Sequence, residues 1–448
     1  MSDDPRQIAF LTLREIYRHS AYADVALDKG LGRASLTDAD RSLATELVYG
    51  CVRKQRSLDR TIDRLATKTA DRQPPDLRIL LHIGLYQLRY LDRVPDAAAV
   101  STTVDLAKAN RLSGLSGFVN GVLRRYSRLR GKETEDLQLP EDPVTRLGIT
   151  YSYPDWIIAN WLKQIGYAET EQLCQTLDRA PSLHLRVNPL KTTIEQVESA
   201  FAERGIAVER VAPLPQSLKL TESAGGITQL PGFAEGWWTV QDSSAQLATH
   251  LLDPQPGETI VDACAAPGGK ATHIAELMGD SGVVWACDRT ESRLKKVRQN
   301  VDRLELQSVR ILAGDSRDFP QFVGQCDRVL LDAPCSGLGT LHRRADLRWR
   351  QTPETTRELV TLQRELLESA ATWVKPGGIL VYATCTLHPP ENQDRIRDFL
   401  DRHSDWHLDP PQPGSLPHPF VTPQGWLEIW SHRFPMDGFF MARLRREA

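Results

Sequence analysis

The first third of the chain carries the spacing of helices. Apolar side chains recur every three or four positions over residues 8–17, 77–88 and 118–123, which places them on one face of an α-helix. Residues 133–145 are polar and acidic and contain two prolines, a composition typical of a linker. We therefore predict an all-helical domain over residues 1–132 and a linker over 133–145.

The region after the linker mixes the two periodicities. Helical and strand-like runs both occur within residues 146–236, which predicts a small α+β subdomain. The helical runs are 154–165, 168–177 and 193–204, and the strand-like runs are 183–188 and 208–211.

From Trp237 onward, short apolar runs alternate with helical patterns. This alternation predicts a parallel, doubly wound sheet, so residues 237–448 read as a Rossmann-like α/β domain. The fold class is therefore multidomain, with all-α, α+β and α/β parts. The strand-like runs are 259–263, 282–287, 309–312, 329–331, 378–383 and a last one at 437–442.

Two of these strands end in a cysteine. Cys335 lies in Asp-Ala-Pro-Cys-Ser-Gly at 332–337, and Cys385 lies in Ala-Thr-Cys-Thr at 383–386. Ligands of open α/β sheets bind at the carboxyl ends of the strands, so the two thiols indicate nucleophilic chemistry. The other cysteines are interpreted as buried small side chains, apart from Cys264 in a turn. Seven cysteines without framework spacing favour reduced thiols in a cytoplasm.

A glycine turn follows the first strand of the α/β domain. A phosphate loop would need glycine where Cys264 stands, and Gly268-Gly269-Lys270 does not form a dinucleotide fingerprint. S-adenosylmethionine, which carries no phosphate, remains as the ligand. Asp288 and Asp315 end the next two strands, where carboxylates would meet the ribose hydroxyls and the adenine amino group.

A cysteine after Pro334 indicates a target that needs covalent activation. Carbon 5 of a pyrimidine fits, because it becomes nucleophilic only after a thiolate adds at carbon 6. Asp332 is expected to hydrogen-bond the base edge as the base gains a proton. Strand geometry alone does not say which thiol attacks.

The motifs at 332–337 and 383–386 resemble those of the RNA cytosine-5 methyltransferases, as does Asp-Ala-Cys-Ala-Ala-Pro-Gly-Gly-Lys at 262–270. Arg-Val-Asn-Pro-Leu-Lys at 186–191 and Asp-Gly-Phe-Phe at 437–440 also fit that family. Residues 1–130 resemble the NusB antitermination fold. The combination resembles the RsmB (Sun) family of bacterial 16S rRNA cytosine-5 methyltransferases over nearly the whole chain.

The resemblance implies roles for individual residues. Cys385 would be the nucleophile, Cys335 would assist product release, and the target would be cytosine 967 in the family's usual rRNA numbering. In DNA cytosine-5 methyltransferases, by contrast, the Pro-Cys thiol attacks. The cofactor would be S-adenosyl-L-methionine, lined by Cys264, Ala265, Ala266, Pro267, Gly268, Gly269, Lys270, Asp288, Asp315 and Asp332.

Basic residues gather in the first domain. Residues 1–132 hold 23 Lys and Arg against 15 Asp and Glu, and the run at 124–132 ends a helix, where cations are also favoured without any ligand. An RNA-binding role and a structural role are both compatible with this cluster. The candidate RNA-binding residues are Arg124, Arg125, Arg128 and Arg130, with Arg186 and Lys191 from the α+β part.

One departure concerns the segment after the Pro-Cys turn. Many relatives read Arg-Arg-His-Pro-Asp there, whereas this chain reads His-Arg-Arg-Ala-Asp at 342–346. The departure bears on the geometry of the active-site loop and not on the reaction class.

Two other functions stay open at this point. A tRNA cytosine-5 methyltransferase would carry the same catalytic motifs, and a non-catalytic RNA-binding or antitermination factor would carry the same basic first domain. The expected partner is 16S ribosomal RNA, with no membrane and no metal, for a cytoplasmic monomer.

Overall fold

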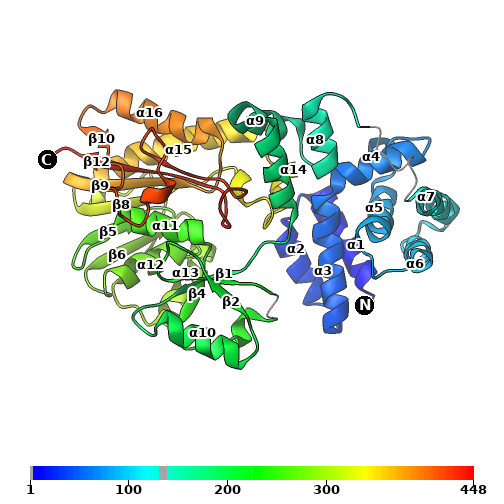
Figure 1. Cartoon of the computed structure of the whole chain (residues 1–448), viewed down its shortest axis with the longest axis horizontal. Helices are drawn as coiled ribbons and strands as arrows, with labels where there is room; N and C mark the ends of the chain where they lie inside the picture. Colours follow the sequence, from blue (N-terminus) through cyan, green and yellow to red (C-terminus); the bar gives the residue numbers. More distant parts are fainter. Residues whose placement is uncertain (1–3, 131–138, 223–224) are drawn as a thin grey trace. The chain divides into compact units, whose positions relative to one another are not determined.

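The computed structural model describes residues 4–130, 139–222 and 225–448 (Figure 1). The first three residues and positions 131–138, which include much of the predicted linker, lie outside the described part. The chain divides into two compact units. Unit 1 comprises Met1–Arg179 and Leu341–Gln351, and unit 2 comprises Ala180–Thr340 and Thr352–Ala448.

Unit 1 contains helices and no strand among its described residues. The prediction of an all-helical first domain is confirmed for residues 4–130, the described part of residues 1–132. Its centre is α5, in which every residue from Ile79 to Leu88 is buried, the pattern of a helix surrounded by others. Its helices are α1 (Pro5–His19), α2 (Ala23–Leu31), α3 (Asp38–Arg53), α4 (Gln55–Leu65), α5 (Pro75–Tyr90), α6 (Asp96–Ala109), α7 (Ser116–Leu129), α8 (Pro143–Tyr151), α9 (Asp155–Asp178) and α14 (Leu347–Arg350).

The segment 341–351 completes unit 1 although it lies far along the chain. Ala345 is fully buried in the helical core, and the indole N–H of Trp349 donates to the carbonyl of Val52 at 2.7 Å. The Arg348 side chain is completely buried, with its guanidinium over the ring of Tyr153. The departure at 342–346 therefore falls in a segment that packs within unit 1.

Unit 2 contains a small antiparallel sheet of order β2-β3-β1-β4. The side chains of Phe201 and Trp238 pack edge to face in its core, with ring centroids 5.9 Å apart. The predicted strands and the helix at 193–204 are present, whereas α8 and α9 group with unit 1. The elements are β1 (His184–Val187), α10 (Ile194–Glu203), β2 (Val208–Arg210), β3 (Ser217–Leu220) and β4 (Trp238–Val240).

The large sheet of unit 2 is mixed, which corrects the prediction of a parallel sheet. Its order is β10-β12-β9-β8-β5-β6-β7, with β11 paired to β12. Strands β5 to β9 are parallel, and β10, β11 and β12 are antiparallel additions. The strands are β5 (Thr259–Asp262), β6 (Val283–Asp288), β7 (Val309–Ala313), β8 (Cys326–Asp332), β9 (Val374–Thr384), β10 (Trp406–Leu408), β11 (Leu427–Ile429) and β12 (Phe439–Arg446).

Helices cover both faces of this sheet. Figure 1 shows α11, α12 and α13 on one face and α15 and α16 on the other, which is the layering of a Rossmann-like domain. These helices are α11 (Ser243–Leu252), α12 (Gly269–Leu277), α13 (Glu291–Leu304), α15 (Pro353–Trp373) and α16 (Gln393–Arg402).

Candidate active site

The two predicted cysteines lie side by side at one edge of the large sheet. Cys335 follows β8 and Cys385 follows β9, and in the register of these parallel strands Asp332 pairs with Ala383. The two Sγ atoms are 3.4 Å apart. Both thiols are partly exposed, whereas Cys51, Cys174, Cys287 and Cys326 are buried.

The thiols differ in their surroundings. The hydrogen bond with Cys385 and burial raise the pKa of Cys335 well above its ordinary value, because both favour the protonated thiol. The Cys335 loop is also fixed directly to the Cys385 loop, since the N–H of Gly339 donates to the carbonyl of Cys385 at 3.0 Å. Cys335 therefore ionises less readily than an ordinary thiol.

Lys270 provides a largely buried cation beside the thiols. Its ammonium donates to the Asp332 carboxylate at 2.7 Å and lies 5.3 Å from the centre of the Phe439 ring. Burial lowers the pKa of Lys270, but the nearby charges of Asp332, Asp262 and Cys385 outweigh this effect, and its pKa is raised. Lys270 thus stays charged between the cofactor turn and the thiols.

Asp262 ends β5 with an unusual environment. Its side chain is completely buried, and no side chain among the described residues donates a hydrogen bond to either carboxylate oxygen. Burial raises the pKa of Asp262 to about 7, although Lys270 opposes the shift. A buried carboxylate without a partner is costly, and the ammonium group of an S-adenosylmethionine would provide one. The residues present therefore fit this cofactor.

The glycine turn after Asp262 requires its glycines. Gly268 has φ +104°, and a Cβ there would lie 3.1 Å from the Cα of Val297. Gly268 thus permits a backbone conformation that other residues adopt only with strain. The turn brings the backbone of the start of α12 close to the sheet edge, where a ligand can approach it.

Arg186 supports this turn from behind and is not on the surface. Its side chain is completely buried, forms a two-pronged ion pair with Glu276 at 2.9 and 2.6 Å, and donates to the carbonyl of Gly269 at 2.6 Å. The prediction that Arg186 contacts RNA is therefore withdrawn, because its donors are directed at protein acceptors in the interior.

Three family models match the chain. They are the 16S rRNA methyltransferase RsmB/F model at residues 249–445, the NusB family model at 3–128, and the ferredoxin-like domain model of RsmF/B-like methyltransferases at 153–225. A probable ribosomal RNA small subunit methyltransferase B from Synechocystis is 51% identical over 98% of this chain and 99% of its own length. The chain belongs to the RsmB/F family of 16S rRNA methyltransferases.

Other members and structures agree with this assignment. A probable ribosomal RNA small subunit methyltransferase B from Bacillus subtilis is 35% identical over 99% of this chain and 98% of its own length. The crystal structure of a methyltransferase homolog protein from Pyrococcus horikoshii is 31% identical, with a TM-score of 0.59 over 68% of this chain and 98% of that one. As an RsmB/F family member, the chain is an rRNA methyltransferase, and its family implies the use of S-adenosylmethionine.

The two other acidic strand ends of this RsmB/F chain each meet an arginine. Asp288 is nearly buried and pairs with Arg293 at 3.1 Å. Asp315 accepts two hydrogen bonds from the guanidinium of Arg317 at 3.0 and 2.7 Å, and these bonds lower its pKa. Both carboxylates are thus oriented before any ligand arrives.

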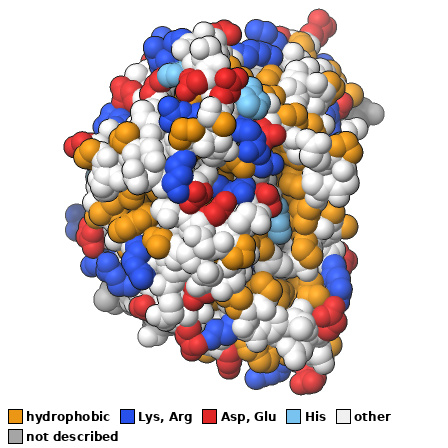
Figure 2. All heavy atoms as spheres, turned by 90° about the vertical axis from the view of Figure 1, so that its left-hand side faces the viewer, with side chains coloured by type: hydrophobic (Ala, Val, Ile, Leu, Met, Phe, Trp, Pro, Cys, Tyr) orange, Lys and Arg blue, Asp and Glu red, His pale blue; other side chains and the backbone are white. Residues whose placement is uncertain are grey.

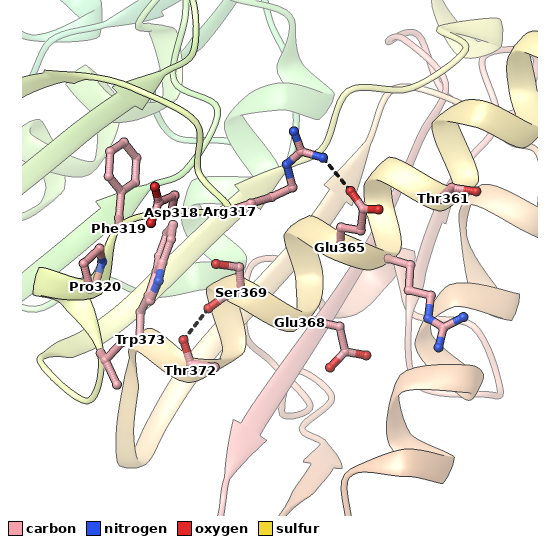
Figure 3. Close-up of a pocket in the computed structure, with 12 residues that line it drawn as sticks. Arg317, Asp318, Phe319, Pro320, Thr361, Glu365, Glu368, Ser369, Thr372 and Trp373 are labelled. Atoms are coloured by element: carbon pink, nitrogen blue, oxygen red, sulfur yellow. Dashed lines mark hydrogen bonds and ion pairs between the residues drawn. The ribbon is translucent and has the colours of Figure 1, made fainter.

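A surface hollow of about 780 Å³ adjoins Arg317. Figure 3 shows that the Arg317 side chain reaches toward Glu365 on α15, with an N–O distance of 2.6 Å. Phe319 and Trp373 form part of its wall. Neither Cys335 nor Cys385 lines this hollow.

The remaining predicted RNA-binding residues differ in exposure. Arg124, Arg125 and Arg128 on α7 are exposed, whereas Arg130 pairs with acidic side chains of unit 1. Lys191 forms an ion pair with Glu305, which directly follows α13. Figure 2 shows basic and acidic side chains interspersed on the face that it presents, so charge does not mark an RNA-binding surface there.

The structure adds side chains that the sequence did not single out. Asp262 stands in the sequence only as the first residue of the motif at 262–270, and Glu391 and Gln363 belong to none of the quoted motifs. Among the described residues, no group of three or more His, Cys, Asp or Glu side chains is arranged to hold a metal ion. No helix among the described residues has the length and apolar character that crossing a bilayer requires.

Proposed function

We propose that the chain transfers a methyl group from S-adenosylmethionine to carbon 5 of a cytosine in 16S rRNA, through a covalent bond between Cys385 and carbon 6 of the base. The proposed target is cytosine 967 in the family's usual rRNA numbering. The observation that carries the proposal is the pair of partly exposed thiols, with Sγ atoms 3.4 Å apart, beside the Lys270–Asp332 ion pair.

The first step is attack on the base. The thiolate of Cys385 adds to carbon 6, and the electron pair of the 5,6 double bond makes carbon 5 nucleophilic. Asp332, held by Lys270, hydrogen-bonds the base edge where the ring gains a proton. When bound, S-adenosylmethionine supplies the electrophilic methyl group that carbon 5 takes up.

The second step frees the product. The proton on carbon 5 leaves to a base, and its electron pair re-forms the 5,6 double bond as Cys385 departs as a thiolate. The ring also gives back the proton that it gained in the first step. Cys335 assists this release, in agreement with the family resemblance. Its raised pKa keeps it neutral beside Cys385, so the site does not hold two adjacent thiolates.

The roles of the thiols are tested by two substitutions assayed with 16S rRNA and S-adenosylmethionine. Cys385→Ala is expected to abolish methyl transfer, and Cys335→Ala is expected to accumulate a covalent protein–RNA adduct that resists denaturing gels. Loss of methyl transfer in Cys335→Ala together with an accumulated adduct in Cys385→Ala would reverse the assignment.

The substrate is tested by bisulfite sequencing of total RNA from a deletion strain. Loss of one methylated cytosine in 16S rRNA is the expected result, and loss in a tRNA instead would support the alternative substrate. Reaching a stacked cytosine requires extrusion, which costs roughly a few kcal/mol, so an unpaired target is favoured. We further propose that the enzyme acts in the cytoplasm as a monomer.

A further inference from the structure

A buried carboxylate lies behind the two cysteine loops. Glu391 ends the short helix η7 (Pro389–Glu391) and its side chain is completely buried. The chemistry proposed above assigns it no role. Isolated buried carboxylates are costly, so its partners indicate what the residue does.

Glu391 accepts hydrogen bonds from the residue next to Cys335. The backbone N–H of Ser336 donates to one carboxylate oxygen at 2.8 Å, and the Ser336 hydroxyl donates to the other at 2.5 Å. The Gln363 amide donates to the first oxygen at 3.0 Å. Nδ1 of His388 lies 3.1 Å from the second. Together these contacts satisfy the carboxylate from four sides.

The same network reaches the loop of the second thiol. The Ser336 hydroxyl lies 2.9 Å from the hydroxyl of Thr386, which directly follows Cys385. The Tyr382 hydroxyl on β9 donates to the backbone carbonyl of Glu391 at 2.6 Å. The Gln363 amide also donates to the carbonyl of Pro334 at 2.8 Å. The residues before and after Cys335 are therefore tied to one carboxylate.

We propose that Glu391 is a positioning residue that holds Cys335 against Cys385 and thereby sets the rate of product release. This inference rests on the proposed function of the two thiols. Glu391 does not touch the base, because Ser336, Gln363 and His388 surround its carboxylate. Its effect is expected on the release step, where Cys335 acts, and not on the attack by Cys385.

The test is Glu391→Gln, which keeps the shape but replaces one acceptor oxygen with an NH₂ group facing other donors. Single-turnover assays with 16S rRNA measure adduct formation and product release separately. We expect release to slow roughly 10- to 100-fold, adduct to accumulate, and adduct formation and S-adenosylmethionine affinity to change less than about twofold. The matched control is Glu358→Gln, on the exposed surface of α15, which should behave as wild type.

Two further variants make the outcome decisive. Ser336→Ala should show a smaller slowing of release, because the backbone N–H bond to Glu391 remains, and it serves as the test if Glu391→Gln does not fold. The double variant Glu391→Gln/Cys335→Ala should release product no more slowly than Cys335→Ala alone, since both changes act on one step.

Contrary results separate the two levels of the proposal. If Cys335→Ala accumulates adduct but Glu391→Gln or Ser336→Ala releases product at the wild-type rate, the inference about Glu391 is wrong. A fall in adduct formation and release by the same factor, together with a lower melting temperature, would give Glu391 a purely structural role. If Cys335→Ala itself leaves no adduct, the proposed roles of the thiols fail.

Discussion

The thiol side and the cofactor side of the sheet edge handle buried carboxylates in opposite ways. Beside the thiols, Glu391 has a partner on every side, whereas Asp262 beside the glycine turn has no side-chain hydrogen-bond donor among the described residues. A satisfied carboxylate fixes the positions of its neighbours, and an unsatisfied one is available to a ligand. The difference teaches that one side is built to position and the other to bind.

The largest effect is expected where the cofactor side is anchored. Glu276→Gln leaves the buried guanidinium of Arg186 without its counter-charge, which should cost about 3 to 5 kcal/mol of unfolding free energy. Denaturant unfolding measures this. The exposed pair of Glu195 and Arg210 supplies the control, because Glu195→Gln should cost less than about 1 kcal/mol. Equal losses of unfolding free energy in the two variants would mean that the buried Arg186–Glu276 pair stabilises the fold no more than an exposed pair.

Lys270 lies between the two sides, and its removal should affect both. Lys270→Met leaves Asp332 unpaired and removes the cation that interacts with Asp262 and Cys385. Single-turnover methyl transfer should fall roughly 100-fold. Lys375→Met is the matched control. Lys375 on β9 pairs with Asp327 on β8, at the end of β8 opposite to Asp332. A normal rate in Lys270→Met would contradict a shared cation.

The binding side should be sensitive to pH. The pKa of Asp262 is about 7, and only the ionised carboxylate attracts the ammonium of S-adenosylmethionine. Affinity should therefore rise as the pH increases through about 7, and Asp262→Asn should weaken binding roughly tenfold and remove this rise. Calorimetry across that range provides the measurement. Asp288→Asn should weaken binding but keep the rise.

The smallest effect is expected in unit 1. Arg124→Gln/Arg128→Gln should weaken RNA binding several-fold and flatten its salt dependence by roughly two phosphate contacts. Binding titrations at several salt concentrations test this, with Arg33→Gln/Arg41→Gln as an equally exposed control pair in the same unit. An unchanged salt dependence in Arg124→Gln/Arg128→Gln would mean that these arginines have a structural role.

The binding elements of the sheet edge could be predicted because their signals are local. Each strand is a short apolar run, and its last residues carry the Asp or Cys, so Asp288, Cys335 and Cys385 were placed correctly at strand ends. The glycine turn was equally visible in the sequence. Gly268 adopts a left-handed backbone conformation, which favours glycine.

The positioning elements could not be predicted, because their partners are distant in sequence. Glu391 follows two prolines and resembles an ordinary first-turn residue of a helix, yet Ser336 and Gln363 lie 55 and 28 residues away. From the sequence alone, Arg186 resembles a surface cation. In the structure it is buried against Glu276, which lies 90 residues later. Burial depends on which elements pack together, and spacing alone does not report this.

The membership of segment 341–351 in unit 1 has a consequence for synthesis on the ribosome. Val52 and Tyr153, which contact segment 341–351, are synthesised early. Ala345, Arg348 and Trp349 follow more than 160 residues after the first part of unit 1 ends. At roughly 5 to 20 residues per second, the surface of the helical core that segment 341–351 covers stays exposed for several seconds or more. The first unit therefore cannot complete its core until β5 to β8, half of the strands of the large sheet, have been synthesised.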